Sequence, residues 1–190
     1  MKHPWLTFAG LCAVVFAIVM TCVIFGSYTS MLRSENRVHK GKELMIMACE
    51  NQLDQIPGLV ALAKGDDMAP VRSRIHDTIE QIRTLLDQFR TPDIPLDPDL
   101  VRMFEQAQSR LAKDLDTLAR GIGTTHPRVQ ETADRYLETI YTARRYNKEA
   151  VYFDSRKKVF PGMFTSEWFN LDTLQFPKID LTCFDPWGLK

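Results

Sequence analysis

The 190-residue sequence lacks the short motifs by which many enzymes are recognised. It contains no G-x-S-x-G turn, no glycine-rich phosphate-binding loop and no E-x-x-H di-iron pattern. The histidines are scattered, so a metal site would have to be assembled across separate helices; they are His3, His39, His76 and His126. We therefore predict no catalytic residue, no metal site and no cofactor.

Cysteine is too sparse for a disulfide framework. Of the four cysteines, Cys12 and Cys22 lie within one apolar stretch, where they behave as small hydrophobic residues. Cys49 and Cys183 are far apart, and no C-x-x-C spacing occurs. This usage fits a reducing compartment.

An excess of charge of either sign is also absent. Lys and Arg total 24, and Asp and Glu total 24. Nucleic-acid-binding domains usually carry a marked basic excess. We therefore expect no nucleic-acid partner.

The chain has a single long apolar run. Trp5 to Phe25 contains no charged residue, and at 1.5 Å per residue such a helix spans the roughly 30 Å hydrocarbon layer. A cleaved signal peptide is the competing interpretation, but it usually has a shorter apolar region and a small-x-small cleavage site, which VIFGSYTS supplies poorly. We predict that residues 1–28 form the one membrane anchor.

Charges beside this run predict an orientation. Lys2 alone lies on the short side, against Arg33, Arg37, Lys40 and Lys42 on the long side. The N-terminus is therefore expected outside and the main domain in the cytoplasm.

Apolar residues at helical spacing predict four helices in residues 29–160. They run from the anchor to about residue 64, from about 70 to 89, from 98 to 122 and from 127 to about 159. Asp97 and Pro98 form an N-cap and N1 pair, and no segment alternates like a strand. The expected fold is all-α: an antiparallel bundle with long first and fourth helices and a shorter pair covering only its distal part.

Residues 161–190 form an aromatic-rich tail that returns near the membrane. Two interpretations are open: the aromatic side chains pack on the first and fourth helices, or they form a membrane-interface or partner-binding surface. The aromatic residues of the tail are Phe164, Trp168, Phe169, Phe176, Phe184 and Trp187.

Three polar or helix-breaking positions interrupt the helical pattern. Pro57 lies inside the first helix, where it should produce a kink. Asn147 and Asp154 fall on the apolar seam of the fourth helix, where a polar group needs a partner, and Arg144 and Arg145 lie within a turn of Asn147. Register specification within the bundle is the plainer interpretation, and an interaction site is the alternative.

Three blocks of sequence resemble the LemA family of bacterial membrane proteins. They are YTSMLRSENR after the anchor, QLDQIPGLVALAKG in the first helix and ARRYNKEAVYFDSRKKVFPG at the end of the fourth. Arg144, Tyr146 and Asn147 match the family's R-x-Y-N pattern, and Phe160–Pro161 match its Phe-Pro. Ala150 and Phe153–Asp154 depart from its intervening Val and Tyr-Asn.

This resemblance implies a bacterial inner-membrane protein with a helical cytoplasmic domain and no established catalytic activity. A relative takes part in magnetosome membrane assembly, so the expected function is that of a non-enzymatic scaffold or membrane-organising protein. Protein partners and self-association are expected, with candidate interaction residues Arg144, Tyr146, Asn147, Asp154, Phe160, Pro161, Trp168 and Phe169. The alternative is a sensory module that binds a ligand in a four-helix bundle.

Overall fold

The protein is all-α. A computed structural model describes residues 4–90 and 96–181, with side chains from residue 8 onward, and none of these residues lies in a strand. Within these described ranges, five α-helices and two 3₁₀ turns follow one another. Phe184, Trp187, Cys183 and the segment 91–95 lie outside the described residues.

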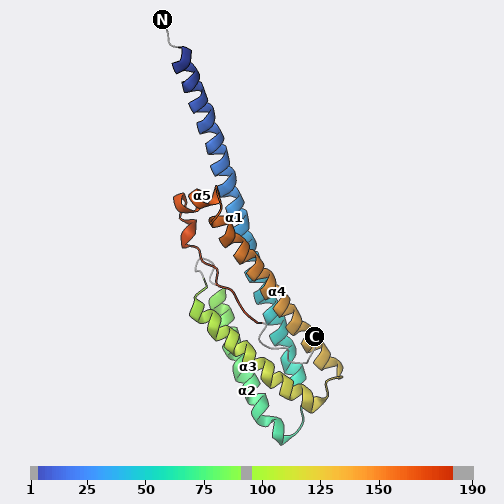
Figure 1. Ribbon diagram of the computed structural model, residues 1–190. Coiled ribbons are helices and arrows are strands. Elements are labelled where there is room, and N and C mark those ends of the chain that lie inside the picture. Colours follow the sequence, from blue (N-terminus) through green and yellow to red (C-terminus); the bar gives the residue numbers. More distant parts are fainter. Residues whose placement is uncertain (1–3, 91–95, 182–190) are drawn as a thin grey trace.

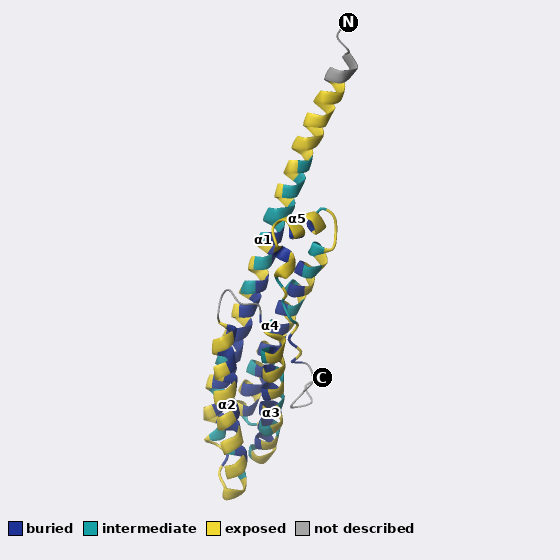
Figure 2. Ribbon diagram, turned by 90° about the vertical axis from the view of Figure 1, so that its left-hand side faces the viewer, coloured by how far each residue is buried: buried dark blue, intermediate teal, exposed yellow. Residues whose placement is uncertain are grey.

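The first helix, α1 (Pro4–Val60), continues without a break from the apolar run into the folded domain. Its N-terminal part projects alone, with apolar side chains such as Phe8, Phe16 and Phe25 exposed (Figure 2). This part is long and apolar enough to cross a membrane, and none of its most apolar stretch is buried within the structure. Such exposure is unfavourable in water and is expected in lipid.

The next three helices alternate in direction. The first and third run toward the projecting end of α1, and the second runs away from it (Figure 1). A 3₁₀ turn (Asp66–Met68) leads to α2 (Ala69–Phe89), followed by α3 (Pro98–Ile122) and α4 (Pro127–Lys157). α1 packs mainly against α4, and α2 packs mainly against α3, so the shorter pair covers only the distal part of the longer one (Figure 1). The distal position of α2 and α3 agrees with the expectation from helix lengths.

Local sequence starts α3 and α4 in the same way. Asp97 accepts a hydrogen bond from the Asp99 amide (2.9 Å), and Pro98 occupies the first turn. His126 Nδ1 accepts one from the Arg128 amide (3.2 Å), followed by Pro127. The Asp97 cap was predicted, whereas His126 was not recognised as a cap.

The α1–α4 interface depends on a small residue. A Cβ placed on Gly41 would lie 3.3 Å from the Cα of Tyr146, so a side chain there would require the α4 backbone to shift by a few tenths of an ångström. Tyr146 is fully buried, and burial raises the pKa of its hydroxyl.

A short chain of buried polar groups joins α1 to α3. Gln108 donates a hydrogen bond to Cys49 Sγ (2.9 Å), and Gln52 donates one to Gln108 Oε1 (3.4 Å). Burial also raises the pKa of the Cys49 thiol. Because unpaired polar groups are costly in a core, this chain favours one register between the helix pairs.

α1 ends at Val60, four residues before the predicted end near Lys64, and α4 ends at Lys157, close to the predicted end near Val159. Pro57 lies inside α1, in its last turn, as predicted, and the kink at Pro57 stays a prediction.

Candidate functional site

The predicted interaction residues all lie in the C-terminal half of α4 and in the segment that follows it. After α4 the chain forms a short helix, α5 (Gly162–Trp168), and a 3₁₀ turn (Leu171–Thr173). The following segment, residues 174–181, runs back along the bundle beside α4 (Figure 1). We call residues 174–181 the strap.

Asn147 fixes the strap by binding both polar groups of one residue. Its Nδ2 donates to the carbonyl of Ile179 (2.7 Å), and its Oδ1 accepts from the Ile179 amide (2.8 Å). The side-chain amide thus pairs with the strap as a neighbouring strand would. Ile179 and Leu181 are buried in the core.

Two more contacts hold the strap against α4 and α3. The Tyr146 hydroxyl donates to the Pro177 carbonyl (3.1 Å), and its raised pKa keeps that proton in place. Glu105 of α3 accepts from the Asp180 amide (2.6 Å). Phe176 packs edge-on against His39 and Phe153, so this tail aromatic covers the flank of α1 and α4.

Asp154 does not occupy the buried seam position that the pattern assigned to it. Its side chain is 42% exposed and pairs with Lys157 (3.1 Å). The buried neighbour is Phe153. Lys157 also donates to the Leu174 carbonyl (2.7 Å), so Asp154 supports the start of the strap through Lys157.

Arg144 and Arg145 do not supply the partner of Asn147. Both are exposed, and within the described residues neither makes a hydrogen bond or an ion pair. The partner is strap backbone about thirty residues later in the chain, a contact that helix periodicity cannot reveal.

The short helix α5 has the opposite arrangement to an amphipathic helix of a water-soluble protein, because its buried side is polar and its exposed side carries large apolar residues. Its buried side chains are the small polar residues Thr165 (0% exposed) and Ser166, whereas Trp168 is 63% exposed. The two hydroxyls bond to carbonyls of their own turn, Pro161 and Met163. Five large apolar side chains in and beside α5 are exposed, and we call them the aromatic platform: Phe160, Met163, Phe164, Trp168 and Phe169.

The aromatic platform is held beside α1 where its charge-free run ends. Phe169 stacks on Tyr28 with ring centroids 4.2 Å apart, and Phe160 meets Phe164 edge-on. Pro161, joined to Phe160 by a cis peptide bond, precedes α5. Figure 1 shows α5 across the side of α1 at the level where α1 leaves the bundle.

Gly162 allows this close approach. A Cβ on Gly162 would clash with the backbone carbonyl of Arg156 and would also contact Met31 of α1. The glycine follows the Phe-Pro pair directly, but sequence analysis did not select it because nothing local showed that α4 would pack against it.

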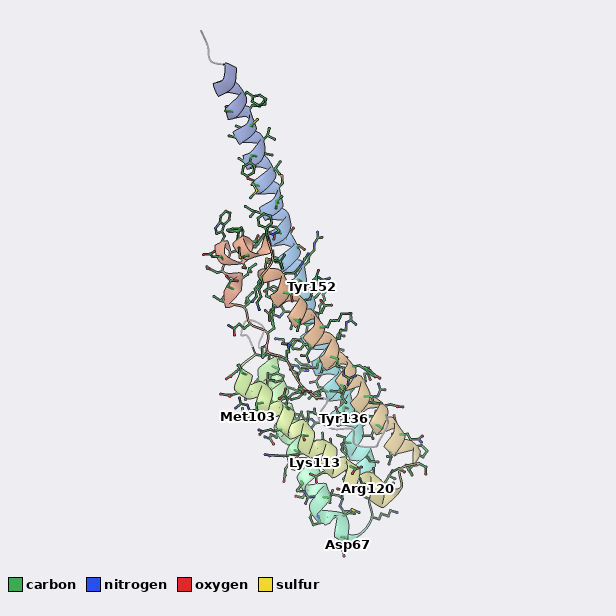
Figure 3. All side chains as sticks on the ribbon, viewed as in Figure 1. Asp67, Met103, Lys113, Arg120, Tyr136 and Tyr152 are labelled. Atoms are coloured by element: carbon green, nitrogen blue, oxygen red, sulfur yellow. The ribbon has the colours of Figure 1, made fainter. Side chains whose placement is uncertain are left out.

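Arg156 is the other residue that sequence analysis missed. It points from α4 toward α1, where its guanidinium donates a hydrogen bond to Ser30 Oγ. Its Cζ lies 5.1 Å from the centroid of the Tyr152 ring, and the Arg37 Cζ lies 5.3 Å from the same centroid. Tyr152 is labelled in Figure 3. Arg37 pairs with Glu149 (3.5 Å), whereas Arg156 has no carboxylate partner among the described residues.

The described residues contain no group of three or more His, Cys, Asp or Glu side chains arranged to hold a metal ion. Comparison of the chain with family models, curated proteins and solved structures yields no match. The resemblance to the LemA family therefore stays a prediction from the residues.

Replacing Asn147 with alanine should release the strap. The variant leaves the amide and carbonyl of Ile179 without their partners, so we expect a loss of roughly 1–3 kcal/mol of local stability. Hydrogen–deuterium exchange of peptides covering residues 174–181 should accelerate. Arg145→Ala, on the same helix, should leave that exchange unchanged, and equal protection in both variants would contradict the role of Asn147.

Replacing Gly162 with alanine should displace α5 from α4. The added methyl meets backbone, which cannot move aside as a flexible side chain can, so we expect destabilisation of about 1–3 kcal/mol in urea unfolding. Gly58→Ala is the matched control, because a Cβ there meets nothing within 4 Å and alanine favours the helix. If the two variants unfold alike, Gly162 is not needed for close packing.

Proposed function

We propose that this chain is a non-enzymatic, single-pass scaffold of the bacterial cytoplasmic membrane, with a LemA-like helical domain. The observation that carries the proposal is the inverted amphipathicity of α5. A platform of exposed aromatic side chains over buried hydroxyls is unfavourable in water but suits the membrane–water interface, where amphipathic aromatic residues gather. Its position beside the end of the apolar run supports this placement.

The continuity of α1 supports a scaffold role. From Phe25 to Val60 the helix extends roughly 50 Å beyond the candidate span. α4 packs along this part of α1 and returns the chain to the aromatic platform. The bundle would thus be held at a defined angle to the bilayer by two contacts, the span and the platform.

The flanking charges support a cytoplasmic domain with a short N-terminus outside. Arg33, Arg37 and Lys40 are exposed, as expected for residues that favour the cytoplasmic side. Lys42 contributes less to this bias, because it is largely buried and burial lowers the pKa of its ammonium group.

The outer face of α4 is the surface that we propose for protein partners or a second copy of this chain. Tyr141, Arg145 and Tyr152 recur at spacings of four and seven residues and are exposed together with Arg144. Tyrosine and arginine are enriched at protein interfaces, where they contribute much of the binding energy.

The position of the platform can be tested by fluorescence. In full-length protein carrying Trp5→Phe and Trp187→Phe, Trp168 is the remaining tryptophan, and brominated lipids in nanodiscs should quench it strongly. The control adds Trp168→Phe and Tyr141→Trp, which places the fluorophore on the bundle, where quenching should be weak. Equal quenching of the two proteins would contradict an interfacial platform.

The partner surface can be tested by photo-cross-linking in native membranes. A photoreactive residue at position 141 should give a discrete adduct, whereas the same residue at Lys113 on α3, labelled in Figure 3, should give none. An adduct of twice the chain mass would identify self-association. The adduct should disappear on Arg145→Glu, and adducts of equal yield at both positions would count against an α4 interface.

A further inference from the structure

Arg156 lies in a cavity at the junction of α1, α4 and α5. The cavity measures about 460 Å³, within the roughly 300–1,000 Å³ typical of ligand sites. Its polar lining includes the hydroxyls of Ser27, Ser30 and Ser155, and its apolar lining includes Met31 and Phe160. A cationic group, hydroxyl donors and an apolar edge therefore meet in one place.

The guanidinium in this cavity is available to an anion. Among the described residues, the guanidinium makes one hydrogen bond, to Ser30 Oγ, and its Cζ lies 5.1 Å from the centroid of the Tyr152 ring. The adjacent Lys157 is already occupied by Asp154 and the Leu174 carbonyl. A half-buried arginine usually has an anionic partner, and phosphate suits its planar fork of donors.

The position of the cavity along the sequence of α1 indicates the source of that anion. Gly26, Ser27 and Ser30 follow directly on Phe25, the last residue of the apolar run, and precede Arg33, the first charged residue after it. In an inserted protein this is the depth of lipid headgroups. The nearby exposed Arg33 and Lys158 add positive charge facing the same layer.

We propose that the cavity binds the phosphate of an anionic glycerophospholipid. Arg156 pairs with the phosphate, the Ser27 and Ser30 hydroxyls donate to its oxygens, and an acyl chain lies along the exposed side chains of Val159 and Phe160 toward the bilayer. The proposal rests on the membrane insertion proposed above. Its consequence is that a bound lipid fastens α4 and α5 to α1 and makes the attachment of the bundle sensitive to membrane composition.

The test measures lipid binding to the full-length protein by native mass spectrometry. With phosphatidylglycerol, wild-type protein should retain one lipid per chain in preference to phosphatidylcholine. Arg156→Gln should weaken phosphatidylglycerol binding about tenfold, the effect of losing one charge-assisted interaction. Arg110→Gln makes the same charge change at an exposed position of α3, away from the cavity, and should bind like wild type.

A second variant tests whether weaker binding reflects loss of the lipid site or misfolding of the junction of α1, α4 and α5. Ser27→Leu keeps Arg156 but fills the cavity, so it should also weaken binding while the helical content stays unchanged. Retention of phosphatidylglycerol by either variant at wild-type affinity would overturn the proposal. So would inorganic phosphate binding as tightly as the lipid, since the occupant would then be a soluble anion.

Carbonate extraction of membranes, done first, distinguishes failure of the site from failure of the proposed function. If the wild-type protein is extracted, membrane insertion is wrong and the lipid site falls with it. If the protein stays in the membrane but Arg156→Gln binds phosphatidylglycerol normally, the lipid site alone is wrong.

Discussion

The close packing of α4 against α1 is the constraint on which the rest of the structure depends. Gly41 lets the two helices approach at Tyr146, and this contact fixes which side of α4 faces outward. It also determines that the end of α4 meets α1 just beyond the apolar run. Every feature of the candidate site follows from that meeting: the Arg156 cavity, the Gly162 contact and the placement of α5.

The strap covers apolar surface that the unequal helix lengths leave open on α1 and α4. α2 and α3 cover only the distal part of the long pair, which leaves apolar flank on α1 and α4. Phe176, Ile179 and Leu181 cover part of this flank. Backbone without regular secondary structure needs hydrogen-bond partners when it is buried, and Asn147 and Tyr146 provide them. Residues first considered as interaction candidates thus have an internal structural role.

The two parts of the tail differ in what they do with their aromatic residues. Phe176 in the strap packs inward, whereas Trp168 and Phe164 on α5 stay exposed. The packing interpretation therefore applies to Phe176, whereas the membrane-interface or partner-binding interpretation of the exposed residues around α5 stays a prediction. Exposed aromatic side chains of this kind favour a membrane–water interface. The end of the bundle beside the apolar run of α1 combines the aromatic platform with a cationic cavity.

The sequence by itself determined the helices, the apolar span and the capped starts such as Asp97–Pro98, because these depend on periodicity and on interactions within one turn. It placed Asp154 wrongly on the buried side of α4, and the end of α1 a few residues too late, since both depend on packing. Only the tertiary structure decided the partner of Asn147 and the surroundings of Arg156 and Gly162. The Asn147 and Arg156 contacts join residues about thirty and more than a hundred positions apart, so no local pattern encodes them, and the contact of Gly162 with the Arg156 carbonyl depends on how the chain turns after α4.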